Sequence, residues 1–309
     1  MPKVGFDDFA DSLGTTSEDI SRKCGHIING VDFDYEIIDG DSRDHVILEV
    51  LMKIEADRQT IGAKERQETW NNGWGENLKD FIDSGYDLKM LVPRFIKPNK
   101  IMRYKQNYIR SVNKDFEFNY YNVFREWIFM TYFKDFRNIY EFGCGTGFNL
   151  VALSKLYPDK NLYGTDFVQS SVDLVNKIGQ AHNLRLKGNI FDMINPTESF
   201  KIQENSLIFT IGSIEQLAGK FEDFLQYLLR NRPGLCVHSE PIIELYDNDN
   251  LLDYLAVKFH QKRGYTQGFL SRLQELEKEG RIEIIKVKRL FFGNLFMDGY
   301  NLLVWRILK

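Results

Sequence analysis

The feature that most constrains this chain is a glycine-rich turn that joins a short apolar strand to a helix. Residues 137–167 read RNIYEFGCGTGFNLVALSKLYPDKNLYGTDF, with glycines at Gly143, Gly145 and Gly147. Glycines let the backbone turn sharply and come close to a ligand. A second strand follows the helix and ends in Asp166, which lies 19 residues beyond Gly147. An acid about 20 residues beyond such a turn, at the end of the next strand, suits the hydroxyls of a ribose.

The spacing of the glycines excludes two common nucleotide sites. The dinucleotide fingerprint is G-x-G-x-x-G, whereas this run is G-x-G-x-G and Phe148 stands where the last dinucleotide glycine would be. This difference argues against NAD and FAD. A P-loop is also excluded, because no Gly-Lys-Ser/Thr follows the glycines to hold a phosphate and magnesium. No polyphosphate ligand is therefore indicated.

These residues resemble motif I and the second-strand acid of class I S-adenosylmethionine-dependent methyltransferases. E-F-G-C-G-T-G at 141–147 is followed by G-T-D at 164–166, and the resemblance extends from about Tyr120 to the C-terminus. It implies S-adenosyl-L-methionine as the cofactor. The residues that would line its methionine and ribose part are Glu141, Gly143, Gly145 and Gly147, with Asp166 on the ribose hydroxyls and Phe167 beside the adenine.

A purely structural interpretation of the turn has to be weighed against this one. Any β-α-β unit can contain a glycine-rich turn simply to connect a strand tightly to a helix. Here the glycine spacing, the leading Glu141 and the distal Asp166 occur together. Their coincidence favours cofactor binding.

The end of the predicted third strand supplies the remaining cofactor contacts. It reads GNIFDM, so Asn189, Ile190 and Phe191 stand at positions that often touch adenine in this family. The family's usual acid after the glycine is replaced by Asn189. Asp192 is the alternative residue for that contact.

Alternating strand and helix patterns predict the fold class. After the first strand, strand patterns at 161–164, 184–191, 206–211 and 234–238 are separated by helical patterns. Such alternation predicts an α/β fold with a doubly wound, Rossmann-like parallel sheet. Two closing strands, at 282–290 and 300–307, match the antiparallel final strand of class I methyltransferases, so the resemblance implies a seven-stranded sheet.

The chain before this sheet predicts a second unit. We expect a mostly helical accessory or cap region over residues 1–118 and the cofactor-binding domain over residues 119–309. Residues 93–114, PRFIKPNKIMRYKQNYIRSVNK, form the most basic stretch. One interpretation is the solvated face of one or two helices. The other is a cap whose Arg and Tyr side chains grip an anionic or hydroxyl-rich acceptor, which makes a carbohydrate a candidate partner.

The ends of the fourth and fifth strands supply the candidate catalytic residues. Ligands bind outside the carboxyl ends of such strands, where TIGSIEQL contains Glu215 and VHSEP contains His238 and Glu240. Methyl transfer chiefly needs alignment of the reactants, and a hydroxyl acceptor also needs a general base. His238 is the first candidate because histidine titrates nearest to working pH. Glu240 or Glu215 would orient it or act as the base. Alternatively, His238 only hydrogen-bonds a neighbouring loop, and Glu240 only fixes that loop.

An acidic run after the fifth strand raises the question of a metal ion. Several oxygen ligands of this kind can hold magnesium, as in some sugar O-methyltransferases; the acids are Glu240, Glu244, Asp247, Asp249 and Asp253. Acids are also common in surface loops before helices, because Asp caps helix N-termini. We therefore assign no metal ligand.

Composition and charge limit the remaining functions. The chain of 309 residues carries a net charge of −4, which gives no basic field for nucleic acid and favours a small-molecule acceptor. Its cysteines, Cys24, Cys144 and Cys236, show neither paired nor metal-binding spacing and suggest reduced thiols in the cytoplasm. No signal segment is visible and no apolar run approaches about 18 residues, so neither secretion nor membrane spanning is expected.

The leading hypothesis is thus a cytoplasmic S-adenosylmethionine-dependent methyltransferase that acts on oxygen of a small or carbohydrate-type acceptor. One rival uses the same cofactor to methylate nitrogen of a small molecule or a protein side chain. Nucleic-acid amines are disfavoured, because S-I-E-Q follows strand four in place of the N-P-P-Y-like tetrapeptide of amino-group DNA methyltransferases. A second rival keeps the fold as a non-catalytic partner-binding module, against which the intact glycines and Asp166 argue. The sequence assigns no oligomeric state.

Overall fold

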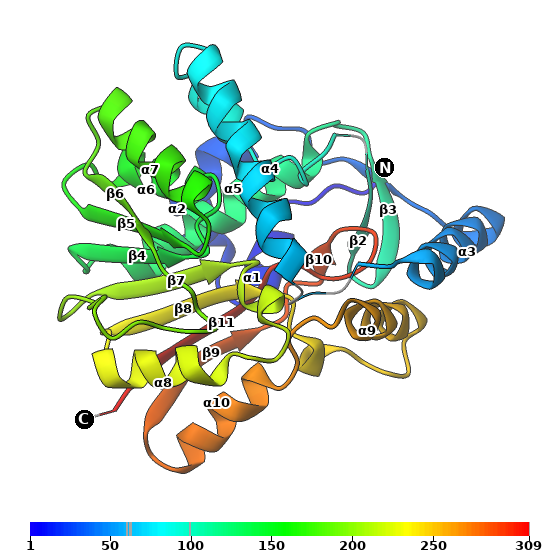
Figure 1. Ribbon diagram of the computed structural model, residues 1–309. Helices are drawn as coiled ribbons and strands as arrows, with labels where there is room; N and C mark the ends of the chain where they lie inside the picture. Colours follow the sequence, from blue (N-terminus) through cyan, green and yellow to red (C-terminus); the bar gives the residue numbers. More distant parts are fainter. Residues whose placement is uncertain (60, 62–63, 99, 309) are drawn as a thin grey trace.

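The computed structural model describes residues 1–59, 61, 64–98 and 100–308, and the larger of its two sheets has seven strands. These are β4 (Asn138–Phe142), β5 (Asn161–Asp166), β6 (Leu186–Ile190), β7 (Leu207–Ile211), β8 (Leu235–Glu240), β9 (Ile282–Lys288) and β11 (Asn301–Ile307). Their spatial order is β6-β5-β4-β7-β8-β11-β9. The strands β4 to β8 run parallel, and β11 is antiparallel to both β8 and β9. This arrangement confirms the predicted α/β class, with a doubly wound parallel sheet and an antiparallel closing strand (Figure 1).

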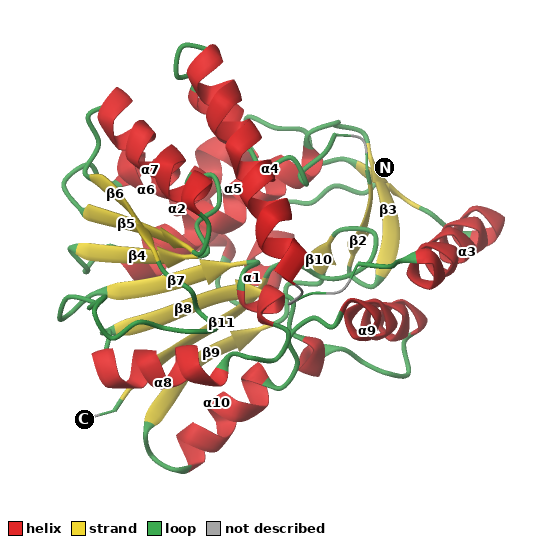
Figure 2. Ribbon diagram, viewed as in Figure 1, coloured by secondary structure: helices red, strands yellow, loops and turns green. Residues whose placement is uncertain are grey.

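Helices cover both faces of this sheet, because its central strands are apolar on both sides. All six residues of β8 are buried, as expected of a strand that lies between two layers. Buried residues of α5 (Phe116–Ile128), α6 (Phe148–Leu156) and α7 (Gln169–Ala181) pack on one face. Those of α8 (Glu222–Asn231) and α10 (Phe269–Lys278) pack on the other. The result is three layers, helix on sheet on helix (Figure 2).

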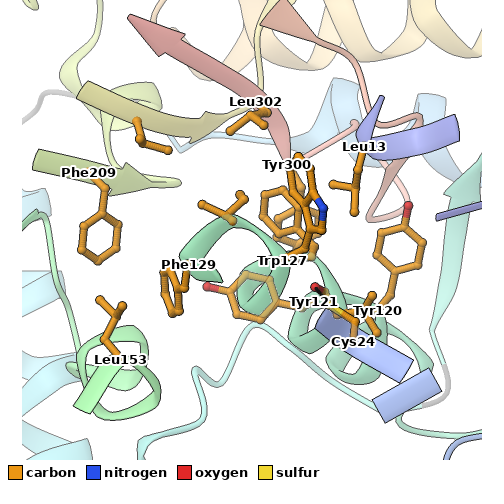
Figure 3. Packing of buried hydrophobic residues seen from close by; sticks show 14 of the residues in the cluster. Leu13, Cys24, Tyr120, Tyr121, Trp127, Phe129, Leu153, Phe209, Tyr300 and Leu302 are labelled. Carbon is orange, nitrogen blue, oxygen red and sulfur yellow. Dashed lines mark hydrogen bonds between the residues drawn. The ribbon is translucent and has the colours of Figure 1, made fainter. Parts of the chain in front are cut away.

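The core on the α5 side also contains the N-terminal helices α1 (Phe6–Leu13) and α2 (Ser17–Ile28). Leu13 and Cys24 of these helices belong to one buried cluster with Trp127 of α5 and Phe209 of β7 (Figure 3). Full burial of a large apolar side chain contributes roughly 1.5–3 kcal/mol. Residues on both sides of the expected boundary at 118 and 119 therefore pack into the same hydrophobic core.

A second, smaller sheet packs one of its faces against this core. It consists of β1 (Tyr35–Ile37), β2 (Ile101–Tyr104), β3 (Asn107–Ser111) and β10 (Phe292–Gly293), in the order β1-β3-β2-β10, and all its pairs are antiparallel. Lys105 and Gln106 form a two-residue hairpin loop with φ of 46° and 59°, as in a type I′ turn. The helical interpretation of the basic stretch 93–114 is therefore wrong. Its strand alternation turns Met102 and Tyr104 into the core, and Arg103 lies buried among charges on the opposite face.

The remaining helices precede the large sheet in the chain or lead into its final strands. Those that precede it are α3 (Gly40–Ala56), α4 (Lys64–Asp83) and the 3-10 turn η1 (Leu88–Leu91), and α4 together with η1 is called the cap below. Irregular turns η2 (Phe129–Phe133), η3 (Ile214–Leu217) and η4 (Ile243–Leu245) follow α5, β7 and β8. The expected break in the segment 251–279 is present, because α9 (Leu251–Arg263) ends at Gly264 and α10 begins after Gly268, both with positive φ. No helix in the described part of the chain is long and apolar enough to cross a membrane.

Candidate functional site

The glycine turn follows β4, beside the point at which the strand order reverses between β4 and β7. Gly143, Gly145 and Gly147 have positive φ values of 73°, 50° and 72°. A Cβ atom on Gly143 would lie 2.4 Å from Cβ of Ser213, so only glycine fits there without displacing its neighbour. Ligands of open α/β sheets bind at such a reversal. The predicted sharp turn is therefore in the position where a ligand site is expected.

Glu141, the last but one residue of β4, turns a buried carboxylate toward a cavity above the glycine turn. Its Oε1 accepts a hydrogen bond of 2.7 Å from Asn149 Nδ2, whereas its buried Oε2 has no hydrogen-bond partner. Burial raises the pKa of Glu141 to about 8, although Asn149 and the nearby Arg125 lower it. A buried carboxylate oxygen without a donor is costly. Glu141 is thus prepared to accept a hydrogen bond from a cationic group in the cavity, which it lines.

The first turn of α6 supports Glu141 from behind. Asn149 Oδ1 accepts hydrogen bonds from Tyr121 Oη, at 2.5 Å, and from Arg125 Nη1, at 3.3 Å. The guanidinium of Arg125 lies 4.1 Å from the centre of the Phe148 ring, in a cation–π contact. Phe148, which stands where the dinucleotide glycine would be and begins α6, therefore packs α6 against α5.

Asp166 fastens the glycine turn from the end of β5. Its Oδ2 accepts a hydrogen bond of 3.0 Å from the Gly145 amide, and its Oδ1 accepts one of 3.3 Å from the Val168 amide. Burial raises the pKa of Asp166 to about 6 in spite of these donors. Asp166 is not among the residues that line the cavity. This carboxylate therefore fixes the position of Gly145.

The predicted adenine contacts separate into two groups. Phe167 and Ile190 are large apolar residues with exposed fractions of 38% and 47%. Phe167 directly follows β5, and Ile190 is the last residue of β6, which pairs with β5. The side-chain amide nitrogen of Asn189, which directly precedes Ile190 in β6, is buried and has no hydrogen-bond partner. Phe191, by contrast, is 2% exposed and packs against Phe142, with ring centres 5.0 Å apart. The assignment of Phe191 as a cofactor contact conflicts with this position in the core.

The cap is attached directly across the glycine turn. Asn71 of α4 forms two hydrogen bonds with Ser170 in the first turn of α7. The Oδ1 atom of Asn71 accepts from the Ser170 amide at 3.2 Å, and the backbone carbonyl oxygen of Asn71 accepts from the Ser170 hydroxyl at 2.7 Å. The indole of Trp74, one turn further along α4, lies 3.0 Å from the position of a Cβ atom on Gly145. Thr146 Oγ1 donates to the Leu91 carbonyl oxygen at 2.7 Å. The cap thus closes one side of the site.

A cavity of about 620 Å³ lies between the cap, the glycine turn and the last third of the chain. A volume in this range accommodates a drug-sized ligand. The residues that carry charged or aromatic groups into its lining include Trp70, Trp74, Arg94, Lys97, Lys100, Glu117, Tyr121, Glu141, Phe148, Glu215, Arg263, Tyr265 and Tyr300. Glu215 is the predicted catalytic residue that this cavity contains. His238 and Glu240 do not line it.

His238 lies inside the protein, on the α10 side of β8. It is fully buried, its ring lies 5.3 Å from that of Phe269 and 6.1 Å from that of Trp305, and Nδ1 is 2.9 Å from Thr210 Oγ1. Burial lowers the pKa of His238 to about 3. Such a group is a poor proton acceptor and has no access to an acceptor molecule. The geometry contradicts the interpretation of His238 as the general base.

Glu240 is the buried anchor of the turn η3. Its carboxylate accepts hydrogen bonds from the amides of Ser213, at 3.1 Å, and of Glu215, at 3.4 Å. Burial raises the pKa of Glu240 to about 7. Glu240 therefore acts on the site through Glu215, which it positions, and matches the alternative interpretation of a carboxylate that fixes a loop.

Glu117 and Tyr300 are cavity residues that the sequence analysis does not single out. Glu117 is 5% exposed; its Oε2 accepts from Lys100 Nζ at 3.0 Å and its Oε1 accepts from Tyr300 Oη at 3.4 Å. An acid in the first turn of a helix is ordinary, because it complements the helix dipole. Glu117 therefore gave no sequence signal of its own, and only the proximity of distant segments distinguishes it.

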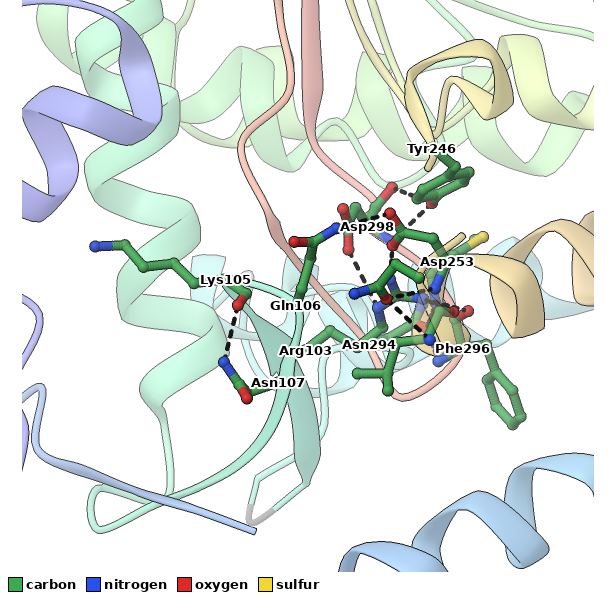
Figure 4. Close-up of polar contacts among 12 residues, drawn as sticks. Arg103, Lys105, Gln106, Asn107, Tyr246, Asp253, Asn294, Phe296 and Asp298 are labelled. Atoms are coloured by element: carbon green, nitrogen blue, oxygen red, sulfur yellow. Dashed lines mark hydrogen bonds and ion pairs between the residues drawn. The ribbon is translucent and has the colours of Figure 1, made fainter. Parts of the chain in front are cut away.

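The acidic run after β8 is not gathered at one point. Asp253 is fully buried and pairs with Arg103 of β2 at a nitrogen–oxygen distance of 2.6 Å (Figure 4). It pairs at the same distance with Arg289, which lies in another segment. Asp298 pairs with the same two arginines at 3.2 and 2.7 Å. Among the described residues, no group of three or more His, Cys, Asp or Glu residues is suited to hold a metal ion.

Comparison with known proteins gives partial structural matches. No protein-family model matches the chain, and no curated protein matches it. The methyltransferase domain of bacterial CtHen1-C is similar over 56% of this chain and 91% of its own, at 17% identity and a TM-score of 0.41. PigF with SAH is similar over 59% and 60%, at 19% identity and a TM-score of 0.42. Human N-acetylserotonin methyltransferase in complex with SAM is similar over 61% and 55%, at 14% identity and a TM-score of 0.40.

Proposed function

We propose that this protein is an S-adenosylmethionine-dependent methyltransferase that methylates a hydroxyl group of a small or carbohydrate-type acceptor. The observation that carries the proposal is the unpartnered Oε2 of Glu141, buried beside the glycine turn and facing the cavity. The α-ammonium group of the cofactor's methionine part supplies the missing donor. When it is bound, the cofactor supplies a methyl group on a sulfonium ion, which is the group to be transferred.

The adenosine part of the cofactor also finds suitable residues. Phe167 and Ile190 offer exposed apolar surface at the ends of neighbouring strands, which suits the faces of an adenine ring. The unpartnered amide of Asn189 can donate to an adenine nitrogen. Asp166 reaches the ribose hydroxyls if its carboxylate accepts from them in addition to the Gly145 amide. The set therefore fits the nucleoside and the amino acid together.

The acceptor side of the cavity supports a small polar molecule. Aromatic residues Trp70 and Tyr265 line it together with the charged Lys97 and Glu215. Aromatic faces stack on sugar rings, and charged groups hydrogen-bond to hydroxyls. The net charge of −4 supports such an acceptor over a nucleic acid.

Binding of the cofactor is tested by calorimetry. We expect S-adenosylmethionine and S-adenosylhomocysteine to bind one site per chain and NAD to show no heat of binding. A Glu141→Gln variant is expected to bind S-adenosylhomocysteine more weakly, because the amide is uncharged and cannot ion-pair with the ammonium. Binding of NAD, or no binding of the two methionine nucleosides, would refute the proposal.

The site of methylation separates the rival functions. Radiolabelled methyl groups should pass from S-adenosylmethionine into the small-molecule fraction of a deproteinised cell extract, and mass-spectrometric fragmentation should locate them on oxygen. Label on nitrogen, or in the protein fraction of a whole extract, would favour the N-methyltransferase. Cofactor binding without any transfer would favour the non-catalytic module.

A further inference from the structure

A buried carboxylate reaches the cavity from the first turn of α5. Glu117 is 5% exposed, yet it is part of the cavity lining. It joins three distant segments, because Lys100 lies before β2 and Tyr300 directly precedes β11. Both of these partners also line the cavity. Three side chains from separate segments therefore meet at one point of its wall.

Tyr300 is held rigidly at this point. Its ring lies 5.4 Å from that of Tyr121 and 5.8 Å from that of Phe124, centre to centre. Burial, followed by the negative charge of Glu117, raises the pKa of Tyr300 well above its ordinary value. Tyr300 therefore stays a neutral hydroxyl that donates to Glu117, and it fixes one carboxylate oxygen.

We propose that Glu117 is the proton acceptor for the acceptor's hydroxyl, and that Tyr300 and Lys100 position its carboxylate. This assignment rests on the proposed function. Glu117 and Tyr121 are four residues apart on α5, so both face the same direction. Tyr121 bonds Asn149, which bonds Glu141. The base thus lies beside the wall that we assign to the methionine end of the cofactor.

The proton and electron balance of the step is simple. The hydroxyl proton passes to the Glu117 carboxylate, and the oxygen forms a bond to the methyl carbon. The bond from that carbon to sulfur breaks, and its electron pair stays on sulfur, which becomes a neutral thioether. Glu117 afterwards loses the proton to solvent. No further reactant is required.

The other candidates are less suited to this role. His238 and Glu240 do not line the cavity. Glu215 does line it, and its Oε1 accepts a hydrogen bond of 2.7 Å from its chain neighbour Gln216. Glu117 differs in that both of its oxygens are positioned by cavity residues from distant segments, Lys100 and Tyr300.

The charges around Glu117 predict the pH dependence of the reaction. Lys100 faces it from the segment before β2, and Tyr300 faces it from the start of β11, with Tyr121 and Glu215 next to Tyr300. Burial raises the pKa of Glu117 above its ordinary value, although Lys100 and Tyr300 lower it. A base must be ionised, so turnover should fall as the pH drops through this raised pKa. Removal of the Lys100 charge should move the fall to higher pH.

The test compares Glu117→Gln with Glu126→Gln, which alters another partly buried acid of the same helix outside this cavity. The probe is methyl transfer from radiolabelled S-adenosylmethionine into the deproteinised extract. We expect Glu117→Gln to lose turnover by roughly 100- to 10 000-fold, whereas Glu126→Gln should keep its turnover. Both variants should bind S-adenosylhomocysteine in calorimetry as the unmodified protein does. Full turnover by Glu117→Gln would overturn the assignment. No turnover by the unmodified protein would overturn the proposed function and this assignment with it.

A second measurement does not depend on folding of the Gln variant and adds a readout besides turnover. The protein is labelled with carbon-13 at the Cδ atom of glutamate and titrated by NMR without cofactor. The Glu117 signal is the one that disappears in Glu117→Asp, and its pKa should lie above that of ordinary glutamates. In Lys100→Met, this titration and the acid limb of turnover should both move upward by the same amount. A Lys100→Met variant that shifts the titration of Glu117 but leaves the acid limb of turnover in place would overturn the assignment, because a purely structural Glu117 would leave the pH profile unchanged.

Discussion

The two halves of the site are built in different ways. Most of the cofactor half comes from one continuous stretch, in which β4, the glycine turn, α6 and β5 follow each other within residues 138–166. The proposed adenine contacts complete it from just after β5, with Phe167, and from the end of β6, with Asn189 and Ile190. The acceptor half comes from separate segments, with Glu117 on α5, Glu215 on η3 and Tyr300 before β11. Local backbone geometry determines the first half. Contacts between distant segments determine the second.

The buried ion cluster of Arg103, Arg289, Asp253 and Asp298 illustrates this dependence. It connects β2, α9 and the segments on either side of β10 (Figure 4). The guanidiniums of Arg103 and Arg289 also lie over the Tyr246 ring, at 5.7 and 4.7 Å from its centre. The segments that it fastens include the one that leads into Tyr300. The acceptor half therefore depends on charged residues that do not line the cavity.

The largest expected effect is loss of this cluster. Asp253→Asn leaves two buried guanidiniums with Asp298 as their remaining carboxylate, and breaking a buried ion pair costs about 3–5 kcal/mol. We expect the free energy of unfolding to fall by about that amount in urea titrations. The matched control is Asp249→Asn, an exposed acid of the same run, with an expected change within about 0.5 kcal/mol. Equal stabilities of the two variants would contradict the structural role of the cluster.

The next effect concerns the cofactor half. Gly143→Ala adds a Cβ atom 2.4 Å from Ser213, at a φ of 73°. Overpacking of this kind costs about 1–3 kcal/mol, so affinity for S-adenosylhomocysteine should fall roughly 10- to 100-fold in calorimetry. Gly219→Ala is the control, because Gly219 has a similar φ of 76° but no atom within 4 Å of its added Cβ. A similar loss in both variants would mean that backbone strain, rather than the clash, is responsible.

The same difference explains how much of the protein was predictable from its sequence. The sheet, the positive φ at the glycines and the burial of Glu141 follow from residues close together in the chain. The sequence does not indicate the β2–β3 hairpin, because Arg103, Lys105 and Arg110 obscure a short alternating pattern and the turn uses Lys105 and Gln106 instead of Asn-Gly.

Side-chain environment was less predictable than chain direction. His238 and Glu215 both follow the rule that functional groups stand at strand ends. The rule does not say which face a strand residue occupies, and His238 faces Phe269 whereas Glu215 lies one turn beyond its strand, in the cavity. Glu117 obeys no such rule, since its function depends on Lys100 and Tyr300, which are 17 and 183 residues away.

The smallest expected effect is a pH dependence of cofactor binding. Burial raises the pKa of Glu141 to about 8, so its carboxyl is largely protonated at pH 7 in the free protein. A cationic ammonium binds the ionised form more tightly. Affinity for S-adenosylhomocysteine should therefore rise from about pH 6 to about pH 8, by at most about tenfold per pH unit, because one proton is released.

The Glu141→Gln variant isolates this proton from those of neighbouring groups. Asp166, with a pKa of about 6, titrates in the same range and acts on Glu141. Calorimetry in two buffers with different ionisation enthalpies counts the protons released on binding. We expect the count near pH 7 to decrease by almost one in Glu141→Gln. An unchanged count would assign the proton to Asp166, and the cofactor half would then depend on the end of β5 more than on the end of β4.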